Sequence, residues 1–305
     1  MLARPPVLDG ELAPAKDDKN TGVTRPLCLS EVWMTELEEI AKRVRRHIVE
    51  TTTAANSGHP SSSLSAVEIG TVLFFGGVLR YDAKNPTWED RDRFILSKGH
   101  AAPLLYALLA ESGFIDISLL PTLRKFGSIL EGHPNLRRVP GVEASTGSLG
   151  QGLSQGIGQA LAAKLDGRDS RVYVLQGDGE TQEGQVWEAI MFAANHNIDN
   201  LTLIIDANTY QQSGSVASIQ PLDPLADKLR AFRWDVTEID GHSMDQVVKA
   251  FEWAKGSIGV PQAIIAHTVK GRGVAFLEEQ GNWHGKPVPA DRLEEALADI
   301  ERGLD

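Results

Sequence analysis

Short apolar runs that alternate with helical stretches constrain the fold of this chain more than any other feature of its sequence. The runs predict buried strands at residues 93–97, 171–176, 201–206, 234–240 and 262–268. Helices are predicted over 64–79 and 184–196, after a glycine-rich loop within 147–165, and at the end of the chain over 291–303. Strands that alternate with helices favour an α/β fold, in which a parallel sheet is flanked by helices on both faces. Ligands of such a sheet bind at the carboxyl ends of its strands.

The two ends of the chain differ in character. Residues 1–30 carry prolines and mixed charges and are predicted to be a flexible N-terminal extension, and 31–305 to be the folded domain. A capping box that starts at Thr35 predicts the first helix, which continues with apolar residues at helical spacing. Residues 269–290 show no clear helix or strand and are expected to form a long loop.

The bulk composition narrows the class of partner. A formal charge of −11 argues against nucleic acid or an anionic membrane surface as a partner of the whole chain. No run approaches the ~18 apolar residues of a membrane-spanning helix, and the first residues lack the apolar region of a signal peptide. The single cysteine, Cys28, excludes an internal disulfide and fits a reducing compartment, so we expect a cytoplasmic protein.

Polar side chains follow two neighbouring predicted strands. Asp178 stands between Gly177 and Gly179, and the glycines let the backbone turn tightly and approach a ligand. Asn208 follows the next strand, so the two side chains are expected side by side. A hard cation such as Mg²⁺ takes oxygen ligands and often bridges a carboxylate to phosphate oxygens. Either feature alone is more often an ordinary turn, but the pair at this spacing favours a metal ion bridged to a diphosphate.

Four of the eight histidines lie beside glycine in predicted loops, namely His59, His100, His133 and His284. A lone histidine is more often structural, but a set of four in loops is not typical of packing. Imidazole with an unperturbed pKa of ~6.5 can donate to phosphate or exchange protons with a sugar hydroxyl. The glycine-rich stretch GQGLSQG does not fit the GxGxxG dinucleotide fingerprint, because its third glycine is one position too far along and no clear strand precedes it.

Five separated motifs resemble, in the same order, those of the amino-terminal half of transketolase. They are ANSGHPSSSLS (55–65), LSKGHAAPLLYA (96–107), EGHPN (131–135), ASTGSLGQGLSQGIGQA (144–160) and NWHGKPV (282–288). In addition, GDGETQEG with the later DAN is similar to the thiamine diphosphate motif. The likeness covers about residues 35–290 and implies the diphosphate-binding domain of the thiamin diphosphate-binding fold.

The resemblance implies a role for each matching residue. His100 would contact the diphosphate, His284 would lie near both the diphosphate and the reacting carbon, and His59 and His133 would bind or deprotonate hydroxyls of the donor. Gly147, Ser148 and Leu149 would contact the aminopyrimidine side of the cofactor, and Asp178, Asn208 and the Tyr210 carbonyl would bind the metal. Glu183 and Glu188 match a buried carboxylate network at a subunit interface, with a solvated helix face as the alternative for both. Gly177, Gly179 and Glu183 are therefore expected to belong to the cofactor-binding site. The metal would be Mg²⁺ or another divalent cation such as Ca²⁺ or Mn²⁺, while Lys98 and Glu180 depart from the pattern and receive no role.

The resemblance also implies a partner. In the transketolase family a glutamate that activates the cofactor lies in a separate pyrimidine-binding domain, and this chain ends at Asp305 directly after the diphosphate-binding half. We therefore expect the thiamine diphosphate-binding subunit of a split transketolase, with a C-terminal subunit of about 300 residues and an α₂β₂ assembly. The reaction implied is transfer of a two-carbon ketol unit between a ketose and an aldose, usually phosphates as in pentose phosphate metabolism. The alternatives are the alpha subunit of a 2-oxo-acid dehydrogenase, a split transketolase recruited by a specialised pathway for an unusual sugar or sulfosugar, or a non-catalytic partner with the same fold.

Overall fold

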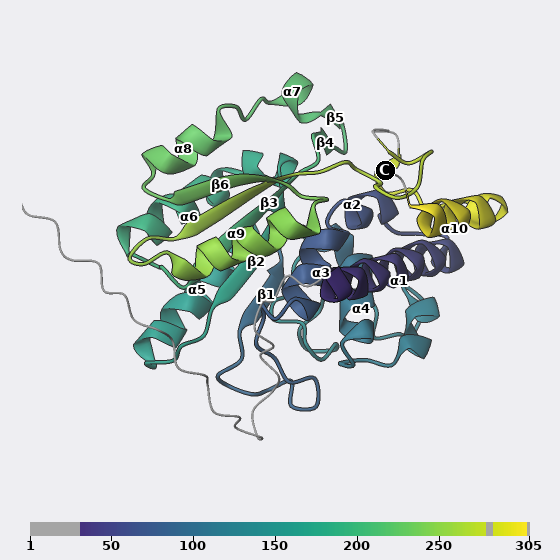
Figure 1. The fold of residues 1–305 in the computed structure, drawn as a ribbon, viewed down its shortest axis with the longest axis horizontal. Coiled ribbons are helices and arrows are strands. Elements are labelled where there is room, and N and C mark those ends of the chain that lie inside the picture. The colour runs from purple at the N-terminus through teal and green to yellow at the C-terminus, as the bar shows by residue number, and fades with distance from the viewer. Residues whose placement is uncertain (1–30, 279–282, 304–305) are drawn as a thin grey trace, which may run out of the picture.

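The chain folds around one five-stranded parallel sheet (Figure 1). The structure is a computed structural model that describes residues 31–278 and 283–303, so the predicted extension over 1–30 lies outside the described residues. The strand order is β1-β2-β3-β7-β6, and every neighbouring pair is parallel. The bounds of the strands are β1 Arg93–Leu96, β2 Val172–Gly177, β3 Leu201–Ala207, β6 Asp235–Asp240 and β7 Gln262–His267. All five predicted strands and the α/β fold class are confirmed.

Alternate residues of each strand pack on opposite faces of the sheet, as the two-residue period of a strand requires. Tyr173 and Leu175 belong to one buried apolar cluster, and Val172 and Val174 to the other. The first cluster includes residues of α1 (Glu31–Ala55), α3 (Val67–Phe75), α4 (Ala102–Glu111) and α9 (Met244–Gly256). The second includes residues of α5 (Gln151–Leu165), α6 (Gly184–Asn195) and α8 (Leu225–Ala231). The sheet in Figure 1 therefore has a layer of helices on each face.

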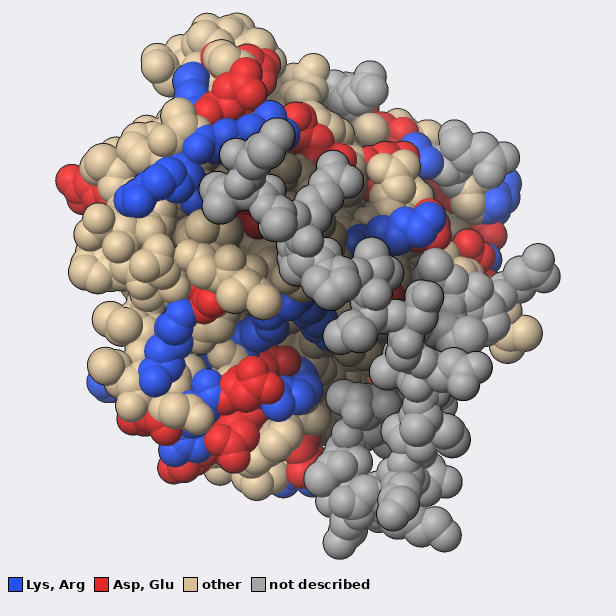
Figure 2. All heavy atoms as spheres, turned by 60° about the vertical axis from the view of Figure 1, so that its left-hand side comes forward, with Lys and Arg blue, Asp and Glu red and all other residues tan. Residues whose placement is uncertain are grey.

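Several short elements complete the structure. They are α2 (Pro60–Leu64), α7 (Val216–Ile219), α10 (Leu293–Arg302), a small hairpin of β4 (Tyr210–Gln211) and β5 (Gly214–Ser215), and 3-10 turns at Gly99–Ala101, Ile117–Thr122, Gly179–Gln182 and Ala290–Arg292. Within the described parts of the predicted loop over 269–290, no α-helix or strand is present, although Trp283 and Ala290 belong to 3-10 turns. No described helix is both long and apolar enough to cross a membrane. On the face shown in Figure 2, Lys and Arg side chains are interspersed with Asp and Glu.

Two helix predictions are wrong in detail. The helix expected over 64–79 is shorter, because α3 begins at Val67 after the non-helical Ala66 (φ −113°, ψ 21°) and ends at Phe75, before Gly76. Leu64 is the last residue of α2, and between the two helices the hydroxyl of Ser65 donates a 2.7 Å hydrogen bond to Asp206. The capping box is also wrong, because α1 already includes Glu31 and Thr35 therefore lies within the helix. Neither error changes which elements form the sheet.

The strand register brings the predicted motifs to one edge. Gly177 pairs with Asp206, and Ala207 pairs with His267. The loops that follow β1, β2, β3 and β7 therefore emerge together at the carboxyl edge of the sheet, where a parallel α/β sheet binds its ligands.

Candidate active site

Asp178 and Asn208 lie in neighbouring loops that a backbone amide joins. Asp178 follows β2, and its carboxylate accepts hydrogen bonds from the amides of Gly179 at 2.7 Å and of Thr209 at 2.6 Å. Thr209 is next to Asn208 in the chain, so the two predicted ligands lie close together, in what we call the Asp178–Asn208 corner. Gly179 is required there, because a Cβ would lie 2.8 Å from the Cβ of Gln211. Burial and the neighbouring Asp206 raise the pKa of Asp178 to about 6. A bound cation would stabilise the ionised form of this buried carboxylate.

A buried polar network supports this corner and accounts for Lys98. The Lys98 ammonium forms an ion pair with Asp206 and donates to the Ser62 carbonyl at 2.7 Å. Asp206 is fully buried, and it also accepts from the side-chain nitrogen of Asn208 at 2.9 Å. The Asn208 side-chain oxygen accepts a hydrogen bond from the Tyr210 amide at 3.2 Å, and its second lone pair is left for a cation.

Glu180, which had no predicted role, is a buried structural carboxylate. It accepts hydrogen bonds from the hydroxyl of Ser97, the amide of Gly150 at 2.9 Å and the amide of Gly177 at 3.1 Å. These three groups come from the end of β1, the start of α5 and the end of β2. Burial raises the pKa of Glu180. The carboxylate therefore ties together three of the segments that surround the site.

Three of the four predicted histidines form a triangle. The ring centroids of His59 and His100 are 5.1 Å apart, and each lies 5.2 Å from the ring of His284. Burial lowers the pKa of His59 to about 4 and of His284 to about 3, and it holds the pKa of His100 well below its usual value. Neutral imidazoles can donate and accept at the same time. The Nδ1 atom of His59 is buried and has no hydrogen-bond partner in the described chain, so a polar ligand atom would satisfy it.

His133 stands beside the predicted aminopyrimidine segment. A Cβ on Gly147 would lie 3.2 Å from the His133 ring, and Gly147 has a φ of +153°. Ser148 is exposed and Leu149 half-buried, so both remain open to a ligand. The segment is held against β1, because the hydroxyl of Thr146 donates to the Leu96 carbonyl at 2.7 Å.

Lys270 is a site residue that the sequence reasoning missed. Its ammonium lies 2.8 Å from Nδ1 of His284 and 3.2 Å from the carbonyl oxygen of Tyr210. Burial and the nearby Lys98 lower its pKa to about 8. A signal was present, since a lysine follows the predicted strand 262–268 at the ligand-binding edge. The Tyr210 carbonyl, a predicted metal ligand, thus already accepts one hydrogen bond and would offer its second lone pair to a cation.

The predicted carboxylates Glu183 and Glu188 are not part of this cluster. Both are exposed on α6 or at its start, and neither carboxylate hydrogen-bonds to a described residue. Their role at a subunit interface stays a prediction. The other four histidines, which were expected to be structural or surface residues, have partners outside this cluster: His47 with Glu111, His242 with Glu68, His267 with Glu238 and His196 with Phe192.

The donor set fits the implied cofactor and metal. The site offers three oxygen ligands: one carboxylate, one side-chain amide oxygen and one backbone carbonyl. They lie close to the two cations Lys98 and Lys270. This set suits a divalent ion whose remaining ligands are phosphate oxygens. In the part of the chain that the structure describes, no group of three His, Cys, Asp or Glu side chains could hold a metal by itself. The cation would therefore depend on oxygens of the bound diphosphate.

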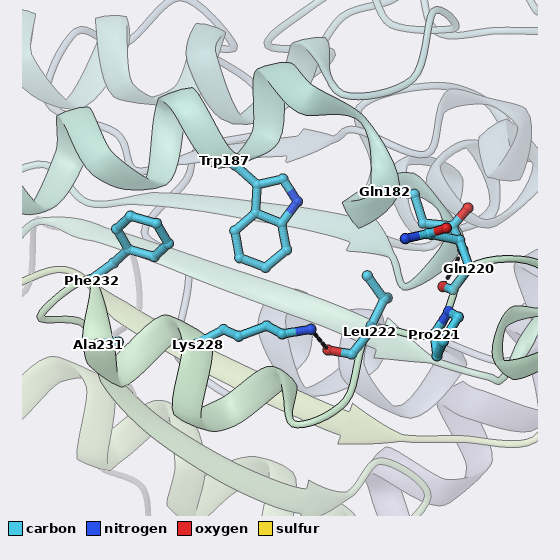
Figure 3. A pocket seen from close by; sticks show the side chains of 8 residues that line it. All are labelled: Gln182, Trp187, Gln220, Pro221, Leu222, Lys228, Ala231 and Phe232. Carbon is cyan, nitrogen blue, oxygen red and sulfur yellow. Dashed lines mark hydrogen bonds between the residues drawn. The ribbon is translucent and has the colours of Figure 1, made fainter.

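A separate pocket of 420 Å³ lies between α6 and α8 (Figure 3). Trp187 and Phe232 form its apolar wall, with ring centroids 6.1 Å apart. Its one cation, Lys228, donates to the Leu222 carbonyl at 2.6 Å. The pocket contains none of the histidines or predicted metal ligands, so its chemistry is not that of the site above.

Comparison with known proteins identifies the family. Residues 37–301 match the family described as "Transketolase, thiamine diphosphate binding domain". The chain is 41% identical over 267 residues to a 6-deoxy-6-sulfo-D-fructose transketolase subunit of Clostridium sp. (strain MSTE9), covering 88% of this chain and 97% of that protein. It is 39% identical over 269 residues to an apulose-4-phosphate transketolase subunit of Phocaeicola vulgatus, covering 88% of this chain and 95% of that protein.

Full-length transketolases match over less than half of their length. Human transketolase is 45% identical over 265 residues, which are 87% of this chain and 42% of the human protein. The crystal structure of transketolase from Campylobacter jejuni superposes with a TM-score of 0.83 at 36% identity, over 88% of this chain and 43% of that one. The predicted assignment to a transketolase subunit is thereby confirmed, and the alternative of a 2-oxo-acid dehydrogenase alpha chain is not favoured. The chain belongs to the transketolase family, and the part that matches is its thiamine diphosphate-binding domain.

Proposed function

We propose that this chain is the thiamine diphosphate-binding subunit of a split transketolase, which transfers a two-carbon ketol unit from a ketose to an aldose. The observation that carries this proposal is the triangle of His59, His100 and His284 beside the Asp178–Asn208 corner. Bound thiamine diphosphate would supply the carbon nucleophile and the electron sink that such a transfer needs. Ketol substrates carry hydroxyl groups, and neutral imidazoles can bind them and move their protons.

The position of each side chain in the site indicates the role that we propose for it. Asp178, Asn208 and the Tyr210 carbonyl would hold Mg²⁺ or a similar divalent cation, and His100, Lys270 and His284 would surround the diphosphate. His59 and His133 would bind and deprotonate substrate hydroxyls, with the unpaired Nδ1 of His59 as one of the polar atoms that a ligand would satisfy. Gly147 and its neighbours would contact the aminopyrimidine.

We propose that a partner subunit completes the site. Two relatives that this chain matches over 95% or more of their length are named as subunits, whereas it spans 42% of human transketolase. A partner of about 300 residues and an α₂β₂ assembly would be the simplest symmetric arrangement. The substrates would be sugar phosphates or related anionic sugars, in a reducing, cytoplasmic compartment.

The test is a ketol-transfer assay on this chain captured from its own source cells, beside the recombinant chain alone. Both receive thiamine diphosphate, Mg²⁺, a ketose phosphate and an aldose phosphate. We expect activity only in the captured material, together with a co-purified chain. Activity of the lone chain would refute the need for a partner. Inactivity of both preparations, with a partner present, would refute transfer between these sugars.

A further inference from the structure

We propose that Arg45, Glu68 and His242 form a triad that positions Lys270 at the diphosphate site. The inference rests on the proposed function, in which Lys270 is one of the residues around the diphosphate. None of the three residues lies in a predicted motif. They act through the backbone on either side of Lys270, so they are positioning residues and not catalytic ones.

Glu68 is the centre of the triad. One oxygen of its carboxylate forms an ion pair with the guanidinium of Arg45, and the other lies 3.1 Å from Nδ1 of His242. The three side chains come from α1, α3 and the loop after β6. Burial by itself would raise the pKa of Glu68, but Arg45 and then His242 lower it to about 2. The carboxylate is therefore ionised and accepts hydrogen bonds from both neighbours.

The His242 ring is held as one tautomer. Its Nε2 accepts a hydrogen bond of 2.7 Å from the backbone amide of Val269. A nitrogen that accepts carries no proton, so the ring proton is on Nδ1, from which it is donated to Glu68. The backbone of the histidine is fixed as well, because its amide donates to the Asp240 carboxylate at 2.9 Å. Glu68 thus makes His242 an acceptor for Val269.

Val269 is the residue directly before Lys270. The amide on the other side of the lysine, that of Gly271, donates to the Ser61 carbonyl at 2.9 Å. The two amides that flank Lys270 are therefore both hydrogen-bonded, one to the triad and one to α2. These bonds fix the Cα atom from which the lysine side chain starts.

Arg45, at the other end of the triad, holds the same segment two residues beyond Lys270. Its Nε atom donates to the Arg272 carbonyl at 3.3 Å. The guanidinium can approach because position 273 is a glycine, where a Cβ would lie 2.8 Å from this nitrogen. The triad therefore anchors the chain on both sides of Lys270, at residues 269 and 272.

The position of this backbone decides what the ammonium of Lys270 reaches. Lys270 is 1% exposed, and its ammonium lies 2.8 Å from Nδ1 of His284 and 3.2 Å from the Tyr210 carbonyl. A buried lysine has little room to compensate for a shift of its backbone. Binding sites need such side chains within about 0.5 Å of their productive position. Loss of the triad should therefore weaken binding of the diphosphate.

A contact between a histidine and a carboxylate can also serve the fold alone, and a second pair of this kind provides the matched control. His47 of α1 lies 2.9 Å from Glu111 at the end of α4. The two imidazoles are similarly buried, with His47 18% exposed and His242 12% exposed. A substitution at His47 thus measures what the loss of such a pair does to the fold.

The first measurement is amide hydrogen exchange of residues 269–273 in the chain without cofactor, for His242→Leu, His242→Gln and His47→Leu. We expect His242→Leu to raise the exchange rate at Val269 about 10-fold, as the loss of one hydrogen bond predicts. His242→Gln should retain most of the protection, because the glutamine amide offers a donor for Glu68 and an acceptor for Val269. His47→Leu should leave exchange in this segment unchanged.

The second measurement is the affinity for thiamine diphosphate in the presence of Mg²⁺, by calorimetric titration of the captured complex and of complexes rebuilt with each variant. We expect His242→Leu to weaken binding about 10-fold, His242→Gln to restore most of it and His47→Leu to change it less than about twofold. In a chain that already carries Lys270→Met, His242→Leu should weaken binding less than about twofold further, because the triad acts through the lysine.

The outcomes separate this inference from the proposed function. Unchanged exchange at Val269 or unchanged cofactor affinity in His242→Leu would overturn the inference. Equal losses of affinity in His242→Leu and His47→Leu, or a full additional loss on top of Lys270→Met, would also overturn it. A complex that binds thiamine diphosphate but transfers no ketol unit would refute the proposed function, while the affinities still decide the role of the triad. A wild-type complex that binds no thiamine diphosphate would refute both.

Discussion

Lys98 and Asp206 form an ion pair whose side chains are 1% and 0% exposed, directly behind the Asn208 amide. Removing one member of a buried pair leaves an uncompensated charge, which typically costs about 3–5 kcal/mol. We therefore predict that Lys98→Met lowers the free energy of unfolding by about this amount, measured with urea in the absence of cofactor. The double variant with Asp206→Asn should regain much of the loss. Lys249→Met, at an exposed pair with Asp245, is the control and should change stability little. A neutral effect of Lys98→Met would show that the pair does not support the fold.

Asp178 is the one carboxylate that the predicted metal set contains. We predict that Asp178→Ala in the captured complex abolishes Mg²⁺-dependent binding of thiamine diphosphate, because no neighbouring carboxylate can replace it: Asp206 is fully occupied by its own partners. The measurement is a calorimetric titration of cofactor with and without Mg²⁺. Asp227→Ala, an exposed aspartate of α8, is the matched control. Unchanged affinity in the Asp178 variant would remove this residue from the metal site.

The fold was predictable because the strands and most helices are marked by local patterns of apolar residues. Five apolar runs predicted five strands, and the Gly-Asp-Gly and Asn motifs then fell at the same sheet edge because parallel strands end together. The break between α2 and α3 was not predicted, and the residue beside it, Ser65, hydrogen-bonds to Asp206, which is 141 residues away. The periodic pattern of a short segment carries no information about a partner so far along the chain.

The buried charged residues of the site were not predicted from the sequence. Lys98, Glu180 and Lys270 are all buried, although lysine and glutamate are almost never fully buried unless they are paired. Their partners are brought in by tertiary structure: Asp206 for Lys98, Gly150 for Glu180 and His284 for Lys270. Within the sequence, each therefore looks like an ordinary surface charge. The histidines were predictable because glycine and proline mark their loops.

Acid should weaken the fold through His59. Its pKa is lowered from 6.5 to about 4 in the folded chain, mainly by burial. The stability contributed by its neutral form is therefore present above pH 6.5 and is lost as the pH falls towards 4, where the folded chain must also take up the proton. We predict that His59→Gln reduces the pH dependence of the unfolding free energy over this window by up to about one bound proton. Urea unfolding of the cofactor-free chain between pH 4 and 8 measures this. An unchanged slope would mean that His59 is not desolvated.

Two glycines of α5 provide a matched test of the packing that holds the glycine-rich segment against the sheet. A Cβ at Gly156 would lie 2.5 Å from Cγ2 of Val174, whereas a Cβ at Gly158 would meet nothing within 4 Å. We predict that Gly156→Ala destabilises the lone chain by about 1–3 kcal/mol through overpacking, and that Gly158→Ala stabilises it by about 0.5–1 kcal/mol because alanine favours the helix.

The same substitution two residues apart separates packing from helix propensity. Since propensity acts equally at both positions, the difference between the two variants measures the contact of α5 with β2. Adding Val174→Ala to Gly156→Ala should return part of the lost stability by making room for the new methyl group, even though Val174→Ala alone leaves a cavity and is destabilising. Thermal or urea unfolding of the four variants gives this coupling directly. If both alanine variants shift stability in the same direction by similar amounts, the helix is not in close contact with the strand at Gly156. The glycine-rich segment would then have to be held against the sheet by its hydrogen bonds to Glu180, Ser97 and the Leu96 carbonyl.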